Sequence, residues 1–99
     1  MKKYAIIADP GVKDDLMDAK SFLESRRTGY GKKFIFEYRK SLILLQKNPY
    51  FQVRYLVVHC YPMKTFKYMI HYKIDEEHKT VHVYAVLSTY LDPDKHYLK

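Results

Sequence analysis

The sequence predicts an α+β fold: an N-terminal strand, an antiparallel helical hairpin and then a mainly antiparallel sheet of three to four strands. Two observations predict it. From residue 10 to residue 47 the apolar residues recur with helical spacing, and from Val53 onward they recur at every second position, which is typical of strands. The 99 residues suffice for one core, so we expect residues 1–99 to form a single domain.

The N-terminal strand is predicted from a short apolar stretch, Tyr4 to Ala8, that is followed directly by Asp-Pro-Gly. Asp9 is expected to cap the first helix, with Pro10 at its first position. The apolar face of this helix is predicted to consist of Val12, Leu16, Ala19 and Leu23.

A second helix is predicted from about Lys32 to Lys47, because two glycines interrupt the pattern before it and Asn48-Pro49 ends it. The linker between the helices is short, which predicts an antiparallel hairpin. The buried stripe of the second helix is predicted to consist of Phe34, Tyr38, Leu42 and Leu45.

Three strands are predicted in the second half of the chain, from the sequences "VVHCYPM", "FKYMIHYKI" and "TVHVYAVLSTY". The last two are joined by the turn sequence "DEEHK" and are expected to pair as a hairpin. The core face of the last strand is predicted to consist of Val81, Val83, Ala85 and Leu87.

The register of this hairpin follows from matching the two core faces, with Ile74 opposite Val81. The same register places Ile70 opposite Ala85 and Tyr68 opposite Leu87. On the other face of the sheet, the open face, the predicted pairs are Lys73 with His82, His71 with Tyr84, and Lys67 with Ser88.

The open face carries the side chains that are best suited to catalysis or binding. Basic groups with interleaved aromatic rings suit phosphate contact and base stacking, and imidazole and phenol groups serve as acid or base in RNA strand cleavage. The alternative is that this face packs against a partner protein, and the sequence favours neither. The residues predicted to project there are Lys67, His71, Lys73, His82, Tyr84, Ser88 and Tyr90.

Composition indicates the kind of partner. The chain has 18 Lys and Arg against 11 Asp and Glu, a formal charge of +7, which favours nucleic acid, a ribosome or an acidic protein as partner. A basic surface that only keeps the protein dissolved is the alternative. The N-terminal apolar stretch is too short for a signal peptide or a membrane span, so we expect a cytoplasmic location and no membrane partner.

Motifs for cofactors are missing from the sequence. No set of Cys and His residues has the spacing of a zinc site, and no Gly-rich loop suits a phosphate chain, so no metal or other cofactor is expected. The single cysteine, Cys60, forms no internal disulfide and is predicted to be a core residue rather than a catalytic thiol.

Four stretches resemble the RelE/ParE toxin family of bacterial toxin–antitoxin systems: "GYGKKF", "KNPYFQVRY", "FKYMIHYKID" and "VYAVL" followed by "DP". The resemblance spans roughly residues 4–95. It implies a RelE/ParE-like fold and a small basic toxin that is neutralised by a cognate antitoxin encoded beside it. RelE-like members cleave mRNA in the ribosomal A site and ParE-like members poison DNA gyrase, and the shared fold does not choose between these targets. A non-catalytic binding module or an inactive toxin-like protein is the alternative.

The family's site residues match this sequence only in part. Met69 stands where RelE-like nucleases have an arginine, and His59 stands where many members have one in the preceding strand. Ser88 and Leu91 occupy positions where many members have a histidine and an arginine. Loss of a cation that stabilises transition-state charge costs about 10²–10³ in rate, which weakens the nuclease interpretation.

Two residues are nevertheless predicted to be catalytic. Tyr90 matches a functional tyrosine at the end of the last strand in some nuclease members, and His71 is chosen for its place on the open face. The residues predicted to bind the substrate or target are Arg54, His59, Lys67, Lys73, His82, Tyr84 and Ser88.

Overall fold

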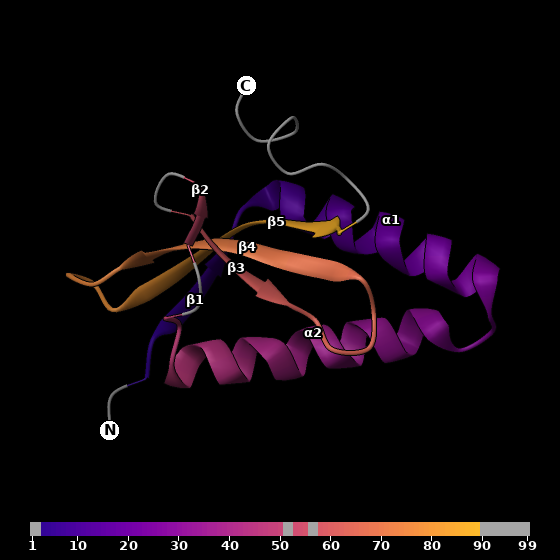
Figure 1. Cartoon of the computed structure of the whole chain (residues 1–99), viewed down its shortest axis with the longest axis horizontal. Coiled ribbons are helices and arrows are strands. Elements are labelled where there is room, and N and C mark those ends of the chain that lie inside the picture. Colours follow the sequence, from indigo (N-terminus) through magenta and orange to yellow (C-terminus); the bar gives the residue numbers. More distant parts are fainter. Residues whose placement is uncertain (1–2, 51–52, 56–57, 90–99) are drawn as a thin grey trace.

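The computed structural model describes residues 3–50, 53–55 and 58–89, and for 53–55 it describes the backbone. Its elements follow the order β1 (Ala5–Ala8), α1 (Pro10–Arg26), α2 (Tyr30–Lys47), β2 (Val53–Tyr55), β3 (Val58–Pro62), β4 (Tyr68–Asp75) and β5 (Thr80–Ser88). The five strands form one sheet in the order β1-β5-β4-β3-β2, as Figure 1 shows. Strand β1 pairs with β5 in parallel and the other neighbours are antiparallel. The predicted α+β fold class is confirmed, and the three-residue edge strand β2 enlarges the predicted sheet.

The helical hairpin forms as predicted, with α2 beginning slightly earlier than expected. Asp9 is the N-cap residue of α1 and Pro10 is its first residue, but the Asp9 side chain makes no cap hydrogen bond to the helix. Between the helices, Gly29 has a φ of 92°, a left-handed conformation that favours glycine. The Glu24 carboxylate accepts hydrogen bonds from the backbone N–H groups of Gly29 and Gly31, at 3.0 to 3.1 Å. These bonds lower the pKa of Glu24 and hold the turn closed.

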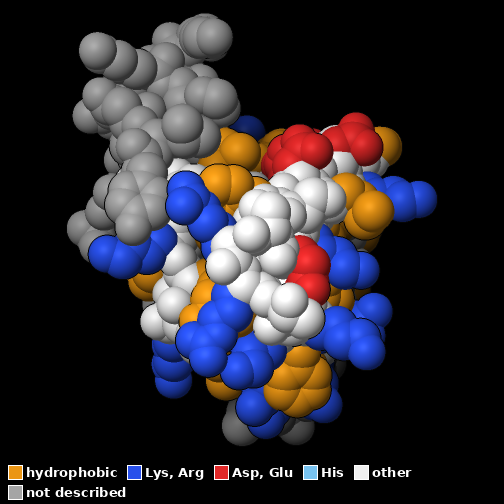
Figure 2. All heavy atoms as spheres, turned by 90° about the vertical axis from the view of Figure 1, so that its right-hand side faces the viewer, with side chains coloured by type: hydrophobic (Ala, Val, Ile, Leu, Met, Phe, Trp, Pro, Cys, Tyr) orange, Lys and Arg blue, Asp and Glu red, His pale blue; other side chains and the backbone are white. Residues whose placement is uncertain are grey.

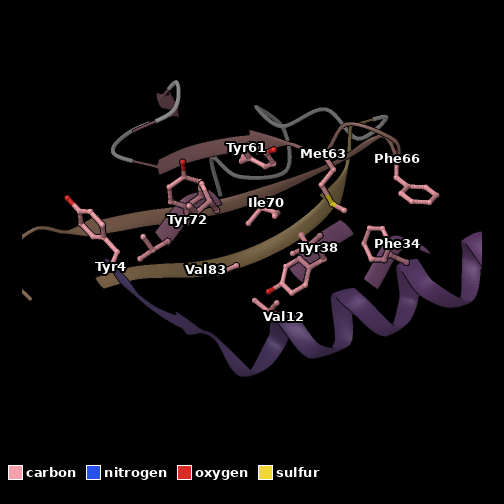
Figure 3. Close-up of a cluster of buried hydrophobic side chains, with 14 residues drawn as sticks. Tyr4, Val12, Phe34, Tyr38, Tyr61, Met63, Phe66, Ile70, Tyr72 and Val83 are labelled. Atoms are coloured by element: carbon pink, nitrogen blue, oxygen red, sulfur yellow. The ribbon is translucent and has the colours of Figure 1, made fainter. Parts of the chain in front are cut away.

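The core lies between the two helices and one face of the sheet (Figure 3). Within the predicted helix stripes, Val12, Ala19, Phe34, Tyr38 and Leu45 are buried. The sheet contributes alternate residues from its central strands, so its other face is the open face of the prediction. The buried sheet residues in this core are Tyr61, Ile70, Tyr72, Val81, Val83 and Val86.

A β-bulge interrupts the predicted register of β4 and β5. Lys73 pairs with His82 as predicted, and Tyr72 pairs with Val83. The next pair joins His71 to Ala85, so Tyr84 is an extra residue in β5 and the predicted pair of His71 with Tyr84 is wrong.

The bulge reverses the faces of the last third of β5. Val86 is 1% exposed and lies opposite Ile70, whereas Ala85 and Leu87 are half-buried. The prediction that Ala85 and Leu87 face the core is therefore wrong, because one inserted residue turns every later side chain over. At the far end of the β4–β5 pair, Ser88 lies opposite Tyr68, so the predicted pair of Lys67 with Ser88 is wrong.

The surface at the turn between α1 and α2 is mixed in character. Figure 2 looks onto this end of the molecule, where Lys and Arg side chains and hydrophobic side chains lie side by side over the lower half. Neither helix has the length and apolar character that a membrane span needs, among the residues that the structure describes.

Candidate functional site

The open face of the sheet brings together three of the predicted target-binding residues. We call Asp9, Lys73, His82 and Tyr84 the open-face cluster. Lys73 and His82 are register partners on the neighbouring strands β4 and β5, so they lie side by side. The His82 and Tyr84 rings stack with centroids 4.8 Å apart at an interplanar angle of 15°, and Lys73 Nζ lies 5.1 Å from the centroid of the Tyr84 ring.

Asp9 orients the imidazole of His82. Its Oδ1 lies 2.5 Å from His82 Nε2, and both side chains are partly exposed, at 38% and 40%. An ionised carboxylate only accepts hydrogen bonds, so Nε2 carries the hydrogen and, in the neutral ring, Nδ1 carries the lone pair. This is the arrangement in which a carboxylate fixes the tautomer of a histidine for acid–base work.

Tyr84 lies beside His82, as the regular alternation predicts. The two residues are two positions apart in β5 and their rings stack on the same face, and Tyr84 is the extra residue of the bulge, without a partner residue in β4. Tyr84 is half-buried, so the phenol retains contact with solvent. The open-face cluster therefore presents an imidazole, a phenol and an ammonium group at one end of the β4–β5 pair.

His71, predicted to be catalytic, is buried. It is 2% exposed, and its Nδ1 lies 3.1 Å from the Sγ of Cys60, which is also buried and pairs with it across β3 and β4. The predicted burial of Cys60 is confirmed. His71 is therefore not accessible to solvent as an acid or base, and its burial favours a packing role.

His59 lies apart from the open-face cluster. Its ring stacks on Tyr72 with centroids 5.5 Å apart, and the edge of Tyr50 lies 6.3 Å away. The Tyr72 hydroxyl donates to the carbonyl oxygen of Pro49 at 2.6 Å. His59 thus belongs to an aromatic row that ties β3 and β4 to the segment after α2.

Lys67 and Ser88 lie at the opposite end of the β4–β5 pair from His82. The carbonyl oxygen of Lys67 accepts the backbone N–H of Thr89 at 2.8 Å. Ser88 is half-buried and lines a cavity of about 240 Å³ together with Asp15 of α1. It therefore lies on the helix side of the sheet, and the prediction that it projects from the open face is wrong, because the bulge turns it over. These two predicted residues are therefore brought near each other but not to the open-face cluster.

Two predicted site residues are only partly covered or not covered by the structure. The backbone of Arg54 lies in β2, and its side chain falls outside the described part. Tyr90 lies outside the described residues altogether. Across the described ranges there is no group of three or more His, Cys, Asp or Glu side chains arranged to hold a metal ion.

Sequence reasoning missed Asp9 as a site residue, since its place before Pro10 pointed to a helix cap. The contact with His82 joins positions 73 residues apart. Its only sequence signal is topological: a first strand parallel to the last one brings the start of α1 beside the start of β5.

Comparisons with known proteins identify the fold. No protein-family model matches the sequence, and no curated protein matches it. The chain is similar to a chromosomal ParDE TA system from P. aeruginosa, with a TM-score of 0.73 and 9% identity over 87% of this chain and 96% of that chain. It is also similar to the E. coli toxin RelE, solved as a double arginine-to-alanine mutant in complex with an antitoxin RelBc peptide. The TM-score there is 0.65, with 15% identity over 96% of this chain and 90% of that chain. The predicted RelE/ParE-like fold is thereby confirmed.

Proposed function

We propose that this chain is the toxin of a bacterial type II toxin–antitoxin system and that it binds a cognate antitoxin protein. The observation that carries the proposal is the fold, which extends over nearly the whole chain in two solved structures from toxin–antitoxin systems. The formal charge of +7 supports it, since a basic toxin suits both an acidic antitoxin and a nucleic-acid or ribosomal target.

Ribosome-dependent mRNA cleavage is the action that the open-face cluster favours. In this mechanism the ribose 2′-hydroxyl attacks the adjacent phosphorus and the bond to the 5′-oxygen of the next nucleotide breaks. His82, oriented by Asp9, accepts the hydroxyl proton at Nδ1, and Lys73 stabilises the charge that develops on the phosphate. Tyr84 offers a ring for base stacking or a phenol to protonate the leaving oxygen.

Poisoning of DNA gyrase is the second candidate. The observation in its favour is Met69, which occupies the position of a nuclease arginine and lies half-buried opposite Leu87. A thioether supplies no charge to a phosphorane at that position. A non-catalytic binding module remains the third candidate, since the open face also suits protein contact.

The first experiment is induced expression of the chain without any antitoxin. Growth arrest is expected for a toxin, and normal growth at a high protein level contradicts the proposal. Primer extension on mRNA after induction then separates the targets: codon-phased cuts indicate a ribosomal nuclease, whereas DNA damage with intact message indicates gyrase.

The site assignment is tested by matched histidine variants. His82→Ala is expected to lower the rate of mRNA cleavage by about 10²-fold, the usual contribution of a general base. His78→Ala is the control, because His78 is an exposed histidine whose bonds to described residues stay within the β4–β5 turn. Equal loss in both variants, or wild-type cleavage by His82→Ala, contradicts the role of His82.

The two residues first predicted to be catalytic are tested in the same assay. Tyr90→Phe is expected to lower cleavage at least about tenfold if its hydroxyl acts as acid or base. His71→Ala distinguishes a chemical role from a packing role when stability is measured beside cleavage. This variant is expected to lose both stability and cleavage, because His71 is buried against Cys60.

A further inference from the structure

A groove runs between helix α2 and the loop that joins β3 to β4, on the helix side of the sheet. We call it the α2 groove, and its cavity has a volume of about 380 Å³. Pockets that hold small molecules typically measure about 300–1,000 Å³ and are mainly apolar with a few polar groups. None of the open-face cluster lines the groove. Its principal lining residues are Lys33, Phe36, Lys40, Leu44, Lys64 and Phe66.

Hydrogen bonds hold the wall of the groove in place. Glu37 Oε2 accepts the backbone N–H groups of Lys64 and Thr65 at 2.8 and 2.9 Å, which ties the β3–β4 loop to α2. One turn further along α2, the Ser41 hydroxyl donates to the carbonyl oxygen of Glu37 at 2.8 Å. Because these bonds form within the chain itself, the groove exists before any ligand binds, and little ordering of the chain opposes binding.

The inner surface of the groove is apolar and aromatic. Phe66 and Tyr61 are each 6% exposed and form its floor, whereas Phe36 and Leu44 border it and are 64% and 45% exposed. Large exposed apolar side chains that border a cavity mark binding sites more often than scattered ones do. A planar ring placed in the groove would remove Phe36 and Leu44 from water and would pack against aromatic neighbours.

The rim of the groove is positively charged. Lys33, Lys40 and Lys64 line it and are exposed, and Lys40 Nζ lies 5.2 Å from the centroid of the Phe36 ring. Glu37 is the only acidic residue that lines the groove, so the lining residues carry a net positive charge. A ligand that matches both features carries several negative charges beside an apolar ring.

We propose that the α2 groove binds a nucleoside polyphosphate. The base packs against Phe36 and Leu44 over the aromatic floor. The phosphates contact the ammonium groups of Lys33, Lys40 and Lys64. A polyphosphate fits this rim better than a nucleic-acid strand does, because it concentrates its charges at one end, whereas a strand spaces them one nucleotide apart. The inference goes beyond the proposed function and does not rest on it, since the groove and the open-face cluster share no residue.

Isothermal titration calorimetry of the full chain with ATP and with GTP tests the proposal. An ionic strength of about 0.15 M limits non-specific attraction to the basic surface. Adenosine, inorganic tripolyphosphate, decanoate and a short single-stranded RNA test the base alone, the charge alone, a simple amphipathic acid and a strand. At least one of the two nucleotides is expected to bind at least about tenfold more tightly than each comparison. Equal or tighter binding of any comparison overturns the proposal.

Two matched pairs of variants locate the site. Lys40→Gln is compared with Arg39→Gln, which removes the same charge from an exposed residue that lines a different cavity. Leu44→Ser is compared with Ile43→Ser, because Ile43 is 51% exposed on the same helix and does not line the groove. Lys40→Gln and Leu44→Ser are expected to weaken nucleotide binding about tenfold, and their partners to stay within about twofold of the parent.

The amide signals of Lys64 and Thr65 give an independent readout. Both N–H groups bond to Glu37 in the wall of the groove, so the bound nucleotide is expected to shift these signals in ¹H–¹⁵N spectra. Equal effects within either pair of variants, or nucleotide binding without a shift of these amides, overturns the proposal. If neither nucleotide binds, the groove assignment is refuted and the toxin function is unaffected, because growth arrest is measured separately.

Discussion

Gly31 allows the two helices to approach, and replacing it with alanine tests that approach directly. A Cβ atom at Gly31 would lie 2.9 Å from Lys20 Cγ and 3.1 Å from both the Lys20 carbonyl oxygen and Glu24 Oε1. The Lys20 side chain can move, but its carbonyl belongs to α1, so α1 and α2 must separate slightly. Forcing extra volume into a packed contact costs about 1–3 kcal/mol.

The expected net effect of Gly31→Ala is a destabilisation of about 1–2 kcal/mol, because alanine returns up to about 1 kcal/mol of helix propensity. For a domain of this size each kcal/mol corresponds to about 4–8 °C in Tm. Gly11→Ala is the matched control: no atom lies within 4 Å of its added Cβ, and α1 is helical there. It is expected to leave stability unchanged or to raise it by about 0.4–1 kcal/mol.

Thermal and urea unfolding of both variants provide the assay. If Gly31→Ala is as stable as Gly11→Ala, the close approach of the helices at Gly31 does not limit stability and the reasoning is refuted. A second variant separates the two causes. Lys20→Ala combined with Gly31→Ala removes the side-chain contact but not the carbonyl contact, so only part of the lost stability is expected to return.

Three further predictions test the bulge, a buried hydrogen bond and the turn. Val86→Ala is expected to cost about 2 kcal/mol in unfolding free energy and Leu87→Ala less than half of that, because the bulge turns Val86 into the core. If urea unfolding shows Leu87→Ala to be the more destabilised variant, the bulge is contradicted and the regular register holds. Tyr72→Phe removes the hydroxyl that donates to Pro49 at 2.6 Å and should cost about 1 kcal/mol in thermal unfolding, because a buried hydrogen bond is lost. The pKa of Glu24 lies below its ordinary value of 4.5 because of two backbone N–H groups, so its contribution is present above about pH 4.5 and is lost as the pH falls through the lowered pKa. Glu24→Gln should therefore flatten the decrease of Tm in acid, and an unchanged acid profile would rule this contribution out.

Local patterns in the sequence were sufficient to predict most of the fold. The helical spacing of Phe34, Tyr38 and Leu45 identified the buried face of α2 because a helix sets that spacing whatever it packs against. In the same way, alternation along β4 placed Ile70 on the core face, where it is buried. These features depend on neighbours within a few positions.

The bulge at Tyr84 could not be predicted in this way. Residues 83 to 87 read Val-Tyr-Ala-Val-Leu, so apolar side chains are available to either face and the pattern does not show where the alternation changes phase. Only packing against the helices decides that Val86 rather than Leu87 enters the core.

The sequence by itself therefore determined the fold class, the order of the elements and the basic character of the surface, since each depends on composition or on short-range periodicity. The tertiary structure alone decided which predicted site residues come together. It joined Asp9 to His82 and separated His71 from them by burying it against Cys60. These two contacts join residues that are 73 and 11 positions apart, and local sequence patterns carry no information about contacts at such separations.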